Sequence, residues 1–130
     1  MSTFQDIKIV GMDDAASHRP DPNKALYDIV LILSSSTPYE WADYFNARWK
    51  QQFYMMKRNA SVSGKSLTIC CVPEELEKHH LPELKKVIEE TNQKYKEYLQ
   101  AQQVQEQQRA EQEKAEKEML SNMKGSIKLD

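Results

Sequence analysis

An unbroken run of five apolar residues, Ile29–Leu33, lies near the start of this chain. A continuous β-branched run of this length is typical of a central strand covered on both faces. Directly after it, Thr37 can cap the free amides of a helix, Pro38 fits the first turn, and Glu40 completes a capping box. We therefore predict a helix over about residues 38–55 that packs on this strand through residues at helical spacing: Trp41, Ala42, Phe45, Trp49, Phe53 and Met56.

The remaining segments predict three more strands and a second helix. Residues 5–12 alternate weakly as a strand, and residues 59–72 predict a hairpin because Gly64-Lys65 suits a two-residue type II′ turn. Pro82 opens a final helix, whose predicted buried face is Leu81, Leu84, Val87, Ile88, Thr91, Tyr95, Tyr98 and Leu99. The order β-β-α-β-β-α predicts an α+β fold. Its four-stranded mixed or antiparallel sheet carries two helices on one face, followed by a long projecting C-terminal helix.

Apolar residues become scarce after residue 99. We therefore expect a single globular α+β domain over residues 1–99 and a polar helical extension over 100–130, fraying or disordered at its end. A coiled-coil frame extended from Leu84 meets five successive polar or charged seam positions between residues 102 and 116, which excludes a strong zipper. Homodimerisation through the final helix remains a hypothesis, because the domain is not expected to cover all of Tyr95, Tyr98, Leu99 and Val104.

Charge and cysteine content limit the classes of partner and compartment. The 130 residues have a formal net charge of −2, whereas dedicated nucleic-acid binders are usually strongly basic. No apolar run of 18 residues exists, and residues 1–6 lack the features of a secretory signal. Cys70 and Cys71 are neighbours and badly placed to bridge each other, so two free thiols indicate a reducing, cytoplasmic location.

The motifs for catalysis or metal binding are weak. Residues 62–66, VSGKS, match the end of a phosphate-binding loop, but Asn59 stands at the required first glycine and no helix follows. Cys70, Cys71, His79 and His80 match no zinc spacing. Cys71 with His79 or His80 is the single candidate pair of nucleophile and base, and no nucleophile elbow accompanies it. We therefore expect no enzyme, no metal and no cofactor.

Two polar segments are candidates for binding. Residues 48–66 contain no Asp or Glu, and cations there are interleaved with aromatic residues: Arg48, Lys50, Lys57, Arg58 and Lys65. The predicted loop 13–25 offers charged side chains for a small-molecule site. The simpler interpretations are a solvated helix end and a connection without a role.

These observations lead to three hypotheses. The first is a non-catalytic protein-protein interaction or regulatory module with a protein partner, self-associating through the C-terminal helix. The alternative is a nucleic-acid-binding module that uses the basic and aromatic segment 48–65. A further alternative is a small-molecule-binding protein or enzyme that uses loop 13–25. Steep salt dependence of binding would separate the second hypothesis from the first.

Overall fold

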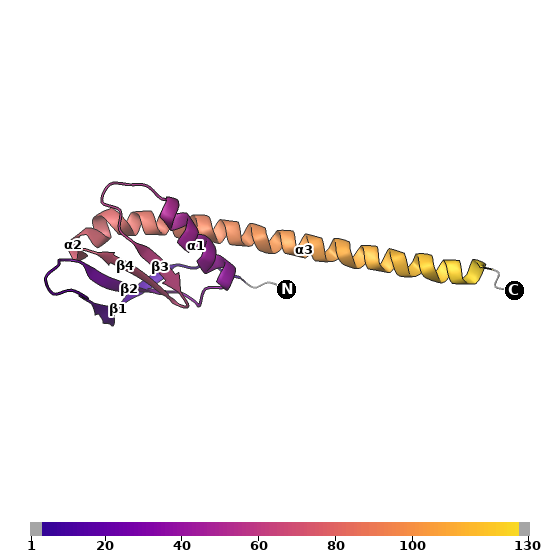
Figure 1. The fold of residues 1–130 in the computed structure, drawn as a ribbon, viewed down its shortest axis with the longest axis horizontal. Helices are drawn as coiled ribbons and strands as arrows, with labels where there is room; N and C mark the ends of the chain where they lie inside the picture. The colour runs from indigo at the N-terminus through magenta and orange to yellow at the C-terminus, as the bar shows by residue number, and fades with distance from the viewer. Residues whose placement is uncertain (1–3, 128–130) are drawn as a thin grey trace. The chain divides into compact units, whose positions relative to one another are not determined.

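The computed structural model describes residues 4–127 and has the predicted order of elements (Figure 1). The chain divides after Tyr95 into two units, and each is described by itself. The elements are β1 (Ile9–His18), β2 (Tyr27–Leu33), α1 (Tyr39–Gln51), β3 (Ala60–Ser63), β4 (Ser66–Cys71), α2 (Pro73–Glu75), the π-helical turn η1 (Leu76–His80) and α3 (Leu81–Ser126).

The four strands form one antiparallel sheet in the order β1-β2-β4-β3. The predicted α+β class is confirmed, and β2 is central as predicted. However, Ile29, Leu31 and Leu33 are buried while Val30 and Ile32 are only half-buried, so the predicted cover on both faces is wrong. Antiparallel strands need no crossover helices, and here the helices cover one face alone.

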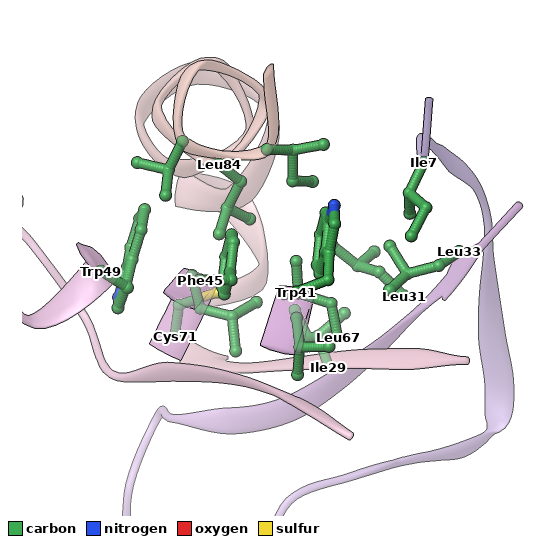
Figure 2. Close-up of a cluster of buried hydrophobic side chains, with 14 residues drawn as sticks. Ile7, Ile29, Leu31, Leu33, Trp41, Phe45, Trp49, Leu67, Cys71 and Leu84 are labelled. Carbon is green, nitrogen blue, oxygen red and sulfur yellow. The ribbon is translucent and has the colours of Figure 1, made fainter. Parts of the chain in front are cut away.

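A stack of three aromatic rings forms the centre of the core. Trp41, Phe45 and Trp49 lie four residues apart on α1, with ring centroids 5.8 and 6.1 Å apart and ring planes within 1° and 7° of parallel. Figure 2 shows the rings in a row, with Leu84 of α3 above them and Leu67 of the sheet below. Their exposed fractions are 0, 0 and 2%, so these large side chains are buried in the core of the protein.

The start of α1 differs from the predicted capping box. Pro38 occupies the N-cap position and makes no side-chain hydrogen bond there. The hydroxyl of Thr37 instead donates to the carbonyl of Gly64 at 2.8 Å, and the Thr37 amide donates to the same carbonyl at 2.9 Å. Thr37 therefore links the hairpin turn to the N-terminus of α1, because both of its donors bond to the Gly64 carbonyl.

The end of α1 also differs, because the helix stops at Gln51 rather than near residue 55. The backbone N–H of Gln52 donates to the carbonyls of Arg48 and Trp49 and closes the last turn. Phe53 is 91% exposed and Met56 45% exposed, so their predicted place in the buried stripe is wrong. Because α1 ends at Gln51, neither Phe53 nor Met56 lies on the helix, and helical spacing does not place them on its buried side.

The hairpin matches its prediction, whereas the predicted loop 13–25 is partly wrong. Gly64 has φ +59° and begins the two-residue turn between β3 and β4. β1 continues to His18 through an irregular stretch, in which the Ser17 hydroxyl donates to the Asp13 carbonyl at 2.7 Å and accepts from the Val30 amide at 2.9 Å. Polar residues that are typical of a loop thus build a bulged edge strand.

One asparagine from each long helix binds backbone groups: Asn46 binds those of Val62 in β3, and Asn92 binds those of Ile7 in the segment before β1. Asn46 of α1 accepts from the Val62 amide at 2.7 Å and donates to the Val62 carbonyl at 3.2 Å. Asn92 of α3 makes the same pair with Ile7, at 3.0 and 2.9 Å, and also accepts from Trp41 Nε1 at 2.9 Å. Each side-chain amide supplies the two hydrogen bonds that a further strand would make there.

The long final helix was predicted, and α3 runs from Leu81 to Ser126. Its buried residues all lie in the first unit: Leu84, Val87, Ile88, Thr91 and Asn92. Residues 100–127 are exposed throughout. Within the described part of the chain, none of the helices combines the length and apolar character needed to cross a bilayer.

Replacing Asn92 should destabilise the first unit strongly. Asn92→Ala leaves the Trp41 indole N–H and both backbone groups of Ile7 without their buried partners, which should lower the free energy of unfolding by about 3 kcal/mol. Urea unfolding followed by tryptophan fluorescence measures this. The control Gln93→Ala changes an exposed neighbour and should stay within about 0.5 kcal/mol. A loss below about 1 kcal/mol for Asn92→Ala would contradict a stabilising role of its hydrogen bonds to Ile7 and Trp41.

Candidate functional site

The segment between α1 and β3 exposes several large apolar side chains to solvent. We name residues 52–58 the presented loop. Phe53 is 91% exposed, Met55 is 87% exposed and Met56 is 45% exposed, whereas Gln52 before them is buried and Tyr54 among them is half-buried. A contiguous exposed apolar group is uncommon on a monomer surface and usually marks an interaction site.

The ends of the presented loop are hydrogen-bonded to their surroundings. Gln52 Nε2 donates to Glu83 Oε2 of α3 at 3.0 Å. At the other end, Trp49 Nε1 donates to the carbonyl of Arg58 at 2.9 Å, and Lys57 Nζ donates to the carbonyl of Lys50 at 3.1 Å. These bonds fix the course of the backbone from which the apolar side chains extend.

A buried histidine anchors the middle of the loop. Tyr54 Oη lies 2.8 Å from His80 Nδ1, and His80 Nε2 lies 3.2 Å from Glu75 Oε2. One neutral tautomer satisfies both contacts, with Nδ1 accepting from the tyrosine and Nε2–H donating to the carboxylate. His80 is fully buried and ends the π-helical turn η1. The tyrosine ring also packs edge-on at 5.8 Å against both Trp49 and His80.

Met56 adopts a backbone conformation that L-residues seldom take. Its φ is 67°, and Met56 is the one non-glycine residue with positive φ in the described part of the chain. A left-handed conformation costs a residue with a Cβ about 1 kcal/mol or more. Such strain persists where surrounding contacts determine the conformation, and it is often found at binding sites. The anchors at Tyr54 and Lys57 provide those contacts here.

The predicted nucleophile and base are not activated. Burial raises the pKa of the Cys71 thiol to about 11, so the thiol stays protonated near neutral pH. Both ring nitrogens of His80 are engaged by Tyr54 and Glu75, which leaves neither free to act as a base toward the thiol. His79 is half-buried on η1. Both cysteines are free thiols.

The structure does not unite the five predicted basic residues in one free surface. Arg48 pairs with Glu90 of α3 at 2.6 Å, and Arg58 Nε lies 3.7 Å from Glu75. The remaining three differ in exposure: Lys57 is half-buried, with its ammonium 5.8 Å from the centroid of the Trp49 ring, and Lys50 and Lys65 are exposed. A carboxylate distant in sequence thus pairs closely with Arg48, whereas the buried Arg58 Nε lies near Glu75 without a hydrogen bond.

The charged residues of the predicted loop 13–25 mainly fix their own segment. Asp13 accepts from the Ala16 amide at 3.1 Å, His18 lies 3.7 Å from Asp28, and the Arg19 guanidinium lies 5.6 Å from the centroid of the Tyr27 ring. Within residues 4–127, no three potential metal-ligating side chains gather at one point.

A cleft of about 330 Å³ lies elsewhere, between the segment before β1 and α3. It is lined by Asp6, Ile7, Lys8, Ile9, Lys85, Ile88, Glu89 and Asn92, and by no residue of the predicted loop 13–25. Two lysines and two carboxylates line it, so the cleft favours no single ligand charge.

The four residues predicted for self-association fall into both units. Tyr95 belongs to the first, where its ring centroid lies 4.7 Å from that of Phe4. Leu99 is half-buried, and Tyr98 and Val104 are 38 and 44% exposed in the second unit. The sequence reasoning missed a later exposed group, Met119, Leu120, Met123 and Ile127, whose spacing along one helix side was the available signal.

No protein-family model matches this chain, and neither does any curated protein or solved structure.

The pH dependence of stability should reveal the buried Tyr54 and Cys71. Burial raises the folded-state pKa of Tyr54 to about 12 and of Cys71 to about 11, above their ordinary values of 10.0 and 9.0. The unfolded chain therefore loses these protons first. The stabilising contribution is complete below pH 9 and is lost as pH rises toward 12.

Urea unfolding between pH 8 and 11 measures this decline. Tyr54→Phe should lower stability at pH 8 by about 1 kcal/mol, since it removes the bond to His80, and should make the fall above pH 10 shallower. Tyr39→Phe, at a 79% exposed site, is the matched control and should leave the profile unchanged. Identical profiles for the two variants would show that Tyr54 is not anchored.

Proposed function

We propose that this protein is a non-catalytic protein-protein interaction module that binds through the presented loop. One observation carries the proposal: Phe53 and Met55 are almost fully exposed on a loop that is hydrogen-bonded to its surroundings through the side chains of Gln52 and Tyr54 and through the carbonyl of Arg58. Loop residues that only connect two elements have no need of such anchors. The anchors favour a loop that is held ready for a partner.

The energetics support this proposal. Burying a Phe or Met side chain contributes about 1.5–3 kcal/mol each, and aromatic residues are frequent at the energetic centres of interfaces. Binding also loses less conformational entropy when the loop is already ordered. Phe53 and Met55 are therefore suited to supply most of the affinity of a small interface.

The charges around the loop favour a protein partner. Lys50 and Lys57 flank Phe53 and Met55, and neither forms an ion pair with a carboxylate in the described residues. Two lysines beside apolar side chains match an apolar surface with an acidic border. Nucleic-acid binding would instead need several free cations, and Arg48 and Arg58 are already paired.

Photo-crosslinking tests the proposal. A photoreactive phenylalanine analogue in place of Phe53, in the full chain expressed in cells of its source organism, should give a discrete protein adduct. The same analogue in place of Tyr39, another exposed aromatic residue, is the matched control and should not give that adduct. Adding Met55→Asp should remove the adduct at position 53. The same adducts from both positions, or none from position 53, would refute binding through this loop.

A further inference from the structure

The end of α3 carries a second exposed apolar group. Met119, Leu120, Met123 and Ile127 are 60, 58, 52 and 43% exposed, and the Ile127 amide still donates to the Met123 carbonyl at 3.0 Å. At 3.6 residues per turn, these four positions fall within about 100° of the helix surface. We name them the apolar arc. An apolar side of this width is typical of a helix that packs against a partner.

The apolar arc has acidic neighbours at its N-terminal end. Glu116 lies one turn before Leu120 on the same side of the helix, and Glu113 lies at the border of that side. Lys124 borders the opposite end. The arc therefore has one charged residue on its own side, Glu116 at its N-terminal end, while Glu113 and Lys117 lie at its border near that end and Lys124 lies at its border near the other.

From this complementarity, and on the basis of the proposed function, we infer that the presented loop binds the apolar arc of a second copy of this chain. The loop is apolar and flanked by Lys50 and Lys57, and the arc is apolar and preceded by Glu113 and Glu116. Opposite charges beside matching apolar groups select this pairing over loop with loop, which would bring lysines together.

The shapes of the two groups also correspond. Glu116, Met119, Leu120 and Met123 occupy positions i, i+3, i+4 and i+7, the arrangement that forms a hole for one side chain on a helix surface. The exposed Phe53 ring is a knob of suitable size. Methionine side chains adapt to an aromatic ring and make favourable sulfur contacts with it.

The pairing is heterologous, because two different surfaces meet. Each chain offers one loop and one arc, so association proceeds head to tail, and an assembly joined in this way keeps one unused arc at one end and one unused loop at the other. The contact involves few residues and falls in the class of small, transient interfaces. We expect a dissociation constant weaker than about 1 μM and a concentration-dependent population of short assemblies.

Sedimentation of mixed variants tests this inference. Phe53→Asp keeps the arc but not the loop, whereas the double variant Met119→Asp with Met123→Asp keeps the loop but not the arc. The wild-type chain should associate with rising concentration, and each variant alone should remain monomeric, with affinity reduced about tenfold or more. An equimolar mixture of the two should form a 1:1 complex, because each supplies the surface that the other lacks.

Charge reversal supplies a second test that avoids apolar substitutions. Lys50→Glu should weaken association, and adding Glu116→Lys should restore it. Tyr39→Asp is the matched control and should associate like the wild-type chain. Circular dichroism of every variant verifies its fold.

Several results would overturn the inference. Association of Phe53→Asp alone would indicate pairing of the arc with itself. A mixture that remains monomeric, or a wild-type chain that is monomeric at every concentration, would exclude pairing of loop and arc. If the purified chain is monomeric while position 53 crosslinks a different protein in cells, this inference fails and the proposed function stands.

Discussion

Stacking of aromatic rings along α1 determines the position of every feature at the candidate site. The series Trp41, Phe45 and Trp49 continues off the helix to Tyr54 and from there to His80, with neighbouring centroids about 6 Å apart throughout. Each end is fixed by a polar contact, to Asn92 at the indole of Trp41 and to Glu75 at His80. Because Tyr54 is the ring where the series leaves the helix, core packing sets the direction in which its neighbours Phe53 and Met55 point.

Much of the fold could be predicted because its signals are local. The run Ile29–Leu33 specifies the central strand, Gly64 specifies the hairpin turn, and the spacing of Trp41 to Trp49 specifies the buried side of α1. The end of α1 could not be predicted, since residues 50–58 contain neither glycine nor proline. Two tertiary contacts form where the helix ends, the hydrogen bond of Tyr54 with His80 and that of Trp49 with the Arg58 carbonyl. No local sequence pattern encodes these contacts.

The candidate site was predicted only in part, because its geometry depends on tertiary contacts. The segment 48–65 was singled out for its charge, and it does contain the presented loop, yet the sequence alone assigns Phe53 and Met56 to the core. Among the predicted basic residues, Arg48 and Arg58 lie close to the carboxylates of Glu90 and Glu75, on segments far along the chain. Ion pairs of this kind depend on how helices pack, and composition gives no information about their partners.

The hydrogen bonds of Asn46 and Asn92 to backbone groups affect how this protein associates at high concentration. The outward backbone groups of Val62 and Ile7 are already bonded to side chains, so at those points a neighbouring molecule finds no ladder to extend. At these two points, contacts with another molecule are left to side chains, which single substitutions can strengthen, weaken or redirect. Fibre-like growth by strand addition at these points would first require α1 or α3 to detach, which ties resistance to aggregation directly to helix docking.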